Sequence, residues 1–206
     1  MKNLKELIKE LENNKEKDVK SFEQLIDHYQ SFNDRNIIIE EIGYEIAVAV
    51  DSVIRFWNSV DNEENIPVNE RKPIKVFIHS PGGFLTSTFT MIDAIKMSKT
   101  PVYTIAMGET YSGGFFTFLA GHKKFAYPHA SFLYHEGATA NGGDANKFRN
   151  FAKFYEVQLE QLRQVVLDNS SISEEEYEKH IKDDWWLTAE EAVEYGIADE
   201  ILTEFI

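Results

Sequence analysis

Short apolar runs alternate with longer stretches of helical hydrophobic spacing along most of this chain. The apolar runs predict strands at 37–39, 74–78, 101–107, 124–127 and 131–135. The stretches between them predict helices from about 45 to 60, from Gly83 to near Lys99, and from Ser112 to Gly121. Strands that alternate with helices imply βαβ units with right-handed crossovers. We therefore expect an α/β fold built on a mainly parallel sheet.

The C-terminal third has a different pattern, in which residues 144–168 form one long helical repeat. Its apolar positions make a broad stripe of Phe148, Phe151, Ala152, Tyr155, Leu159, Leu162 and Val166. This is more apolar surface than one small domain is expected to cover, so the stripe predicts a contact between subunits. Capping boxes at Ser173 and Thr188 then predict two shorter helices.

The N-terminal stretch is rich in Lys and Glu, and its leucines and isoleucines follow helical spacing. We interpret residues 1–34 as a helical appendage and residues 35–206 as one domain. A chain of 206 residues is long enough to bury one substantial core.

Composition excludes several classes of function and several kinds of site. A formal net charge of −14, with no Lys/Arg cluster, argues against nucleic-acid binding. No apolar run approaches the roughly 18 residues that span a bilayer, and the N-terminus lacks a signal-peptide core, so we expect a cytoplasmic protein without a membrane partner. The chain has 0 cysteines, which excludes a thiol nucleophile and thiolate metal sites. Since the glycine-rich turns do not match a nucleotide loop, we expect no cofactor and no metal.

Two glycine-rich turns follow predicted strands, and both would lie at the carboxyl edge of a parallel sheet, where ligand sites form. One is Ser80-Pro-Gly-Gly83 and the other is Ser112-Gly-Gly114. Ser112 between a strand and a helix could simply cap the helix. The same position also suits a nucleophile, with the backbone N–H groups of Gly83 and Gly113 as donors to an oxyanion.

A serine nucleophile needs a base and a group that orients the base. His135 ends the apolar strand Phe132-Leu-Tyr-His135, and Asp184 precedes an aromatic pair that we expect to be buried, leaving this carboxylate desolvated. Taken singly, each of these two residues is more often structural than catalytic. The order Ser112, His135, Asp184 differs from that of the α/β-hydrolases, and Thr110 breaks their G-x-S-x-G elbow.

These residues resemble the proteolytic subunits of the Clp protease family, serine peptidases of the crotonase-like superfamily. The resemblance covers about residues 36–202. The motifs that carry it are Phe77-Ile-His-Ser-Pro-Gly-Gly83, Met107-Gly-Glu-Thr-Tyr-Ser-Gly-Gly-Phe-Phe116, Phe132-Leu-Tyr-His135 and Asp184-Trp-Trp-Leu-Thr-Ala-Glu-Glu-Ala-Val-Glu-Tyr-Gly196. The chain departs from the family's usual Asn at His79, Met at Gly113 and Gln-Pro at Glu136-Gly137, and residues 1–34 do not match the family's axial-pore segment. At Gly113 we expect the pocket wall to lose bulk.

The resemblance implies an ATP-dependent Clp-type serine endopeptidase that cleaves peptides or unfolded proteins inside an oligomeric chamber. It implies Ser112 as nucleophile, His135 as base, Asp184 as orienting acid, and Gly83 and Gly113 as the oxyanion hole. Substrate would pair with Phe84 and Leu85 and with Glu136 and Gly137. A handle at about 137–170 would stack two heptameric rings of a homo-oligomer, and an AAA+ unfoldase would be the partner.

Two other classes of function remain open at this point. One is a structural or regulatory ring subunit with the same fold and little activity. The other is a crotonase-type acyl-CoA enzyme, which would share the two N–H donors and leave Ser112 and His135 unexplained. Peptide hydrolysis and acyl-CoA binding distinguish them.

Overall fold

The computed structural model describes residues 30–137, 139 and 143–206. The chain divides into two units, Met1–Asn36 and Ile37–Ile206, and all the helices discussed below belong to the second. The helical pattern expected between residues 1 and 26 lies outside the described residues, so that prediction has no structural counterpart here.

The second unit is built on a sheet in which most neighbours are parallel. Its strands are β1 (Asn36–Ile39), β2 (Ile74–Ser80), β3 (Val102–Tyr111), β4 (Lys123–Ala126), β5 (Ser131–Tyr134), β6 (Trp185–Thr188) and β7 (Glu200–Ile201). The order is β1-β2-β3-β4-β7, with β5 beside β3 and β6 beside β5. The β2–β3, β3–β4, β4–β7 and β3–β5 pairs are parallel, and β5–β6 is antiparallel. The predicted α/β fold is therefore confirmed.

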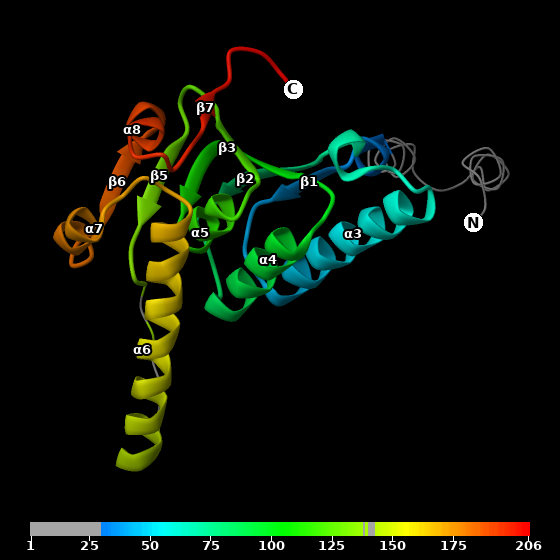
Figure 1. The fold of residues 1–206 in the computed structure, drawn as a ribbon. Helices are drawn as coiled ribbons and strands as arrows, with labels where there is room; N and C mark the ends of the chain where they lie inside the picture. Colours follow the sequence, from blue (N-terminus) through cyan, green and yellow to red (C-terminus); the bar gives the residue numbers. More distant parts are fainter. Residues whose placement is uncertain (1–29, 138, 140–142) are drawn as a thin grey trace, which may run out of the picture. The chain divides into compact units, whose positions relative to one another are not determined.

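Helices cover this sheet in layers (Figure 1). They are α3 (Tyr44–Glu63), the 3-10 turn η1 (Val68–Glu70), α4 (Leu85–Met97), α5 (Gly113–Leu119), α6 (Ala145–Asp168), α7 (Glu174–His180) and α8 (Ala189–Glu194). All residues of α5 are buried, because it packs directly on β2 and β3. Helix α4 packs on α5, and α3 packs on α4. The short helix α8 packs against β5, β6 and β7.

Strand β3 is longer than its apolar run, and it has two neighbours on one side. The run ends at Met107, whereas the strand continues to Tyr111. Its first half pairs with β4, from Tyr103 to Ala106, and its last residues pair with β5, from Glu109 to Tyr111. Because a strand can pair beyond its buried core, hydrophobic spacing alone ended it too early. The extension brings the residue after Tyr111 beside the end of β5.

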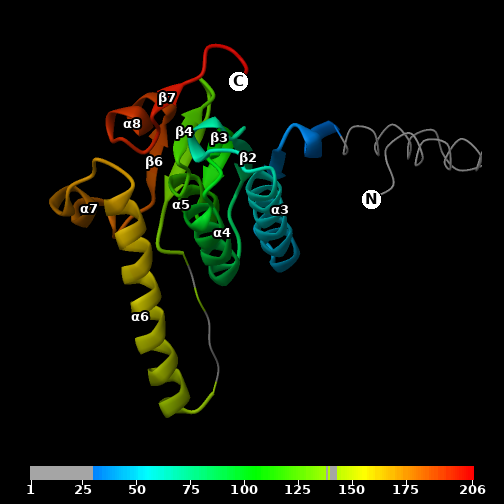
Figure 2. The same cartoon turned by 45° about the vertical axis from the view of Figure 1, so that its right-hand side comes forward.

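Helix α6 runs away from the sheet (Figure 2), and its buried residues, Leu162 and Val166, both lie in its C-terminal half. Leu162 and Val166 join the core, while Phe148, Phe154 and Val157 are exposed. The apolar stripe is thus partly covered by its own domain. Of the large stripe residues Phe148 is exposed, while the exposed Phe154 and Val157 lie on other faces of the helix.

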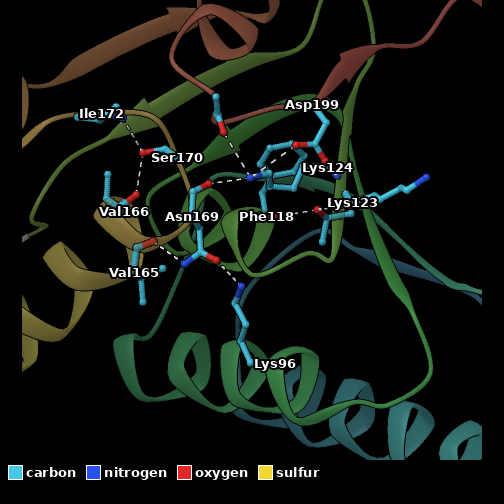
Figure 3. Close-up of polar contacts among 12 residues, drawn as sticks. Lys96, Phe118, Lys123, Lys124, Val165, Val166, Asn169, Ser170, Ile172 and Asp199 are labelled. Atoms are coloured by element: carbon cyan, nitrogen blue, oxygen red, sulfur yellow. Dashed lines mark hydrogen bonds and ion pairs between the residues drawn. The ribbon is translucent and has the colours of Figure 1, made fainter. Parts of the chain in front are cut away.

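The C-terminal end of α6 is tied to the sheet by a partly buried lysine, Lys124 (Figure 3). Lys124 on β4 donates from Nζ to the backbone oxygens of Asn169, at 2.7 Å, and of Gly196, at 3.3 Å. Its ammonium also lies 3.8 Å from Asp199 Oδ1, and Lys96 donates to the Asn169 side-chain oxygen. A cation here satisfies carbonyls that a helix end leaves unpaired and complements the helix dipole. The base of α6 is therefore fixed relative to β4.

Candidate active site

Ser112 lies at the turn from β3 into α5 with a backbone conformation that is rare for a residue with a side chain. Its φ is 51° and its ψ is −121°, and its N–H donates to the Leu133 oxygen at 2.9 Å. Such a conformation costs about 1–3 kcal/mol and persists only where the surroundings enforce it. Ser112 occupies the N-cap position, yet its side chain makes no capping hydrogen bond. The capping interpretation is therefore wrong, and Oγ is not committed to the helix.

Two backbone N–H groups face the region beside Ser112. Gly83 forms a parallel bridge with Ile42. The Ile42 N–H donates to Gly82 O, and the Phe84 N–H donates to Ile42 O, so the N–H of Gly83 points away from Ile42. A Cβ built on Gly113 would stand 3.5 Å from the Gly83 nitrogen, so the two glycines are neighbours. Within the described residues neither N–H donates to a backbone carbonyl. Paired free N–H groups beside a nucleophile are what an oxyanion requires.

The register of β5 and β6 brings His135 and Asp184 together. These strands pair antiparallel up to Tyr134 and Trp185, so His135 and Asp184 form the next pair along. His135 Nδ1 lies 3.8 Å from Asp184 Oδ1, which is an ion-pair distance and longer than a hydrogen bond. Their side chains are 33% and 59% exposed. The arrangement is that of a base and its orienting carboxylate, held loosely.

Two expectations about this segment are wrong. The Asp184 carboxylate is exposed instead of desolvated, and only the first of the two following tryptophans is buried. The reason is strand geometry, because successive side chains of β6 point to opposite faces. Trp185 enters the core, whereas Trp186 is 55% exposed and packs edge-on against Tyr111 at 5.1 Å.

A pocket of about 350 Å³ joins most of the predicted residues. Ser112, His135 and both glycines, Gly83 and Gly113, line it, while Asp184 lies outside its lining. The four residues predicted to bind substrate also line it, and they are Phe84, Leu85, Glu136 and Gly137. Within the described residues no hydrogen bond links Ser112 to His135. Such bonds are often long in a substrate-free enzyme and shorten in the complex.

A family model described as Clp protease matches residues 20–205. The chain belongs to the Clp protease family. It is also 33% identical over 132 residues to the ATP-dependent Clp protease proteolytic subunit 2 of Treponema denticola. That alignment covers 63% of this chain and 66% of the relative, so it spans just under two thirds of the relative's length. The family match begins at residue 20, ahead of the resemblance expected from about residue 36.

Helix α6 contributes pocket residues that the sequence did not mark as functional. Phe151, Tyr155, Gln158 and Leu162 line the pocket opposite the strand ends, together with Phe116 of α5. Their spacing places them on one face of the helix, and that spacing was the available signal. It could not distinguish a wall of this pocket from a contact with another subunit. In this Clp family member, the same stripe therefore contains both pocket residues and an exposed residue.

Hydrogen bonds made by tyrosine hydroxyls stabilise the segment that carries His135. Tyr155 Oη donates to the Glu136 backbone oxygen at 3.1 Å, and the Tyr155 ring stacks on Phe151. Behind the strand, the hydroxyls of Tyr134 and Tyr177 lie 2.6 Å apart, and burial raises the pKa of Tyr134 above its ordinary range. Both tyrosines therefore stay protonated and can each donate a hydrogen bond at neutral pH.

Charge inside the pocket is concentrated at one residue. Burial, followed by the charge of Glu178, raises the pKa of Glu136 above its ordinary value. In turn, burial and the Glu136 charge raise the pKa of Tyr155.

Within the described residues, no group of three or more His, Asp or Glu side chains is placed to hold a metal ion. In the same part of the chain, no helix is both long and apolar enough to cross a membrane.

Proposed function

We propose that this Clp family chain is a serine endopeptidase in which Ser112 attacks the peptide carbonyl. The observation that carries the proposal is the state of Ser112. Its side chain does not cap the following helix, it lines the same pocket as His135, and two unpaired N–H groups lie beside it. A strained strand-to-helix turn that exposes a serine in this way is typical of a nucleophile.

In the proposed mechanism, the Ser112 oxygen bonds to the carbonyl carbon while the hydroxyl proton passes to His135. The N–H groups of Gly83 and Gly113 donate to the oxyanion that forms. His135 then returns the proton to the leaving amine as the C–N bond breaks, which leaves an acyl-enzyme. Water, activated by the same histidine, releases the acyl group and restores Ser112. Asp184 stabilises the imidazolium from the Nδ1 side, at the distance of 3.8 Å described above.

For the substrate we propose an extended peptide that adds as a strand between two short segments. Phe84, which is extended, follows the first glycine turn, and Leu85 after it begins α4, so Leu85 would contact the peptide by its side chain. Glu136 and Gly137 follow His135, and all four line the pocket. Strand addition supplies main-chain hydrogen bonds, which are independent of side-chain identity. This mode suits an enzyme that accepts unfolded proteins.

For the assembly we propose a cytoplasmic homo-oligomer of stacked heptameric rings, fed by an ATP-driven AAA+ unfoldase. The support is family membership together with the exposed apolar side chains of Phe148, Phe154 and Val157 on α6. Large apolar side chains exposed on several faces of a helix that leaves the domain are typical of an interface. Native mass spectrometry tests this directly, because a stable monomer of 23.8 kDa would contradict it.

The catalytic proposal is tested by covalent labelling with a fluorophosphonate. Intact-protein mass spectrometry should show one adduct, and peptide mapping should place it on Ser112. Ser112→Ala should show none, while Ser131→Ala serves as a matched serine control and should label normally. Absence of an adduct on the wild-type protein, under conditions that label a known serine peptidase, would refute the nucleophile.

A second candidate is a ring subunit of low activity. The observation that favours it is the loose His135–Asp184 pair, which lies 3.8 Å apart and is partly exposed. Exposed ion pairs of this kind contribute little energy. Hydrolysis of a peptide by homogeneous protein, abolished in Ser112→Ala, would exclude this candidate.

A further inference from the structure

Glu136 is the one acidic side chain among the described residues that line the pocket. The lining contains no lysine or arginine, and apart from His135 its other members are neutral. Within the described residues the Glu136 carboxylate forms no hydrogen bond and no ion pair. A partly buried carboxylate in a pocket of mixed polar and apolar lining, with no partner of its own, is a group that a substrate can pair with.

The neighbours of Glu136 make its negative charge unfavourable in the empty pocket. Glu178 adds a second negative charge nearby, and desolvation acts in the same direction, so the pKa of Glu136 is raised. Arg163, which lies near Glu178, also pairs with Glu160 and Glu174 and is therefore shared. A cation placed in the pocket would relieve both the desolvation and the repulsion.

The remaining walls suit the stem of a long basic side chain. Phe151 and Tyr155, which are partly exposed, present aromatic surface, while the nearly buried Phe116 and Leu162 complete the apolar part of the lining. Lysine and arginine bury their methylene groups on such surfaces and keep the charged head at a polar group. The head can also lie over an aromatic ring, an arrangement that adds to the attraction. A pocket of about 350 Å³ is within the range that holds small ligands.

We infer, on the basis of the proposed peptidase function, that this pocket selects peptides that place a lysine or arginine side chain beside Glu136. Glu136 is then a specificity-determining residue, and it takes no part in bond breaking. The aromatic residues of α6, Phe151 and Tyr155, hold the stem, and the carboxylate holds the charged head. The net charge of −14 acts in the same sense at long range, since it attracts cationic peptides to the protein.

The first test compares N-acetylated fluorogenic peptides that differ at the residue preceding the scissile bond. Lysine is matched with norleucine, which has the same stem without the charge, and glutamate is the acidic counterpart. We expect kcat/KM for lysine to exceed that for norleucine by roughly five- to tenfold, as for a partly buried ion pair. In Glu136→Gln this ratio should fall to about one, while the exposed control Glu190→Gln should keep it. A wild-type ratio of one or below, or a ratio unchanged in Glu136→Gln, would overturn the inference.

Reversing the charge at Glu136 should create a new peptide preference, which a variant that is merely damaged could not show. Glu136→Lys should prefer the glutamate peptide over the lysine peptide, inverting the wild-type order. If Glu136→Lys retains the wild-type preference, the carboxylate is not the selecting group.

Binding to Ser112→Ala separates this inference from the proposed activity. Fluorescence anisotropy with the same labelled peptides should show the lysine preference in Ser112→Ala and its loss in Ser112→Ala combined with Glu136→Gln. If the wild type neither labels nor hydrolyses, the catalytic proposal fails, and the anisotropy alone decides the role of Glu136. If the wild type cleaves the norleucine peptide without any lysine preference, only the inference about Glu136 fails.

Discussion

The hydroxyl oxygen of Thr88 occupies the space that a side chain on Gly113 would take. A Cβ built on Gly113 would stand 2.5 Å from Thr88 Oγ1, and this hydroxyl is held in place by a 3.1 Å hydrogen bond to the Phe84 oxygen. The sequence led us to expect a pocket wall that loses bulk at Gly113. In the structure Thr88, a buried residue of α4, lies where the first carbon of such a side chain would be.

We therefore predict that Gly113→Ala destabilises the fold by about 1–3 kcal/mol, as overpacking of a filled site does. Adding Thr88→Ala should recover part of the loss, because it removes the clashing oxygen. Thermal and urea unfolding measure both effects. Gly43→Ala is the control, since a Cβ there meets nothing within 4 Å. Additive losses in the double variant would contradict the proposed clash.

Asp184 should matter less than Ser112 or His135. Because its carboxylate is exposed and 3.8 Å from His135, we predict that Asp184→Asn lowers kcat/KM by about 10- to 100-fold, against roughly 10³-fold or more for Ser112→Ala and His135→Ala. Peptide hydrolysis provides the measurement. The neighbouring exposed carboxylate offers a matched control, and Asp183→Asn should remain within twofold of the wild type. Equal losses for Asp184→Asn and Ser112→Ala would show that the pair tightens fully in the complex.

Glu136 should make stability depend on pH. Its pKa is raised in the folded protein, so the folded state binds the proton more tightly than the unfolded state. The contribution of Glu136 to the free energy of unfolding is therefore favourable at low pH. It is lost as the pH rises through the pKa that Glu136 has in the folded protein. We predict that Glu136→Gln stabilises the protein at pH 8 by up to about 1 kcal/mol, a value discounted for solvent screening.

Denaturant unfolding at several pH values checks this prediction. The gain from Glu136→Gln should shrink as the pH falls through the ordinary glutamate pKa of about 4.3, below which both states carry the proton. The exposed Glu204→Gln should show no comparable gain. A gain that grows as the pH falls would contradict the sign of the shift.

Lys124 should stabilise the base of α6. Replacing it by methionine keeps the stem and leaves the carbonyls of Asn169 and Gly196 without their donor. We predict a loss of about 1 kcal/mol, since these acceptors are partly buried and water can reach them in part. Hydrogen exchange should accelerate first in the last turn of α6, whereas the exposed Lys99→Met should change neither stability nor exchange. Exchange that rises evenly over the whole domain would argue against a local anchor.

The sequence was sufficient to predict the fold because hydrophobic spacing and turn residues agree along most of the chain. Pro81-Gly-Gly83, Ser112-Gly-Gly114 and the capping box at Thr188 mark boundaries that the structure has within a few residues. The end of β3 was missed because Glu109 and Thr110 are polar or small and do not extend the apolar run. Pairing with β5, which is a long-range contact, keeps them in the strand.

The candidate site could be predicted in part. Ser112 and His135 end neighbouring strands, so parallel pairing of β3 with β5 was enough to bring them into one pocket. The environment of Asp184 could not be predicted, because exposure depends on which face of β6 meets the core. The contribution of Tyr155 to the pocket could not be predicted either, since hydrophobic spacing gives the face of a helix on which a residue lies and does not identify what that face contacts.

At Ser112 the stability of the fold and the proposed reaction favour different residues. Glycine adopts the Ser112 φ of 51° without penalty, so folding alone would favour glycine there, as it does at the neighbouring Gly82 and Gly83 turn. Under the proposed function, the hydroxyl of Ser112 is what keeps a serine at that turn. Drift towards a purely structural ring subunit would then begin at residue 112, as a replacement that strengthens the fold while it removes the proposed reaction.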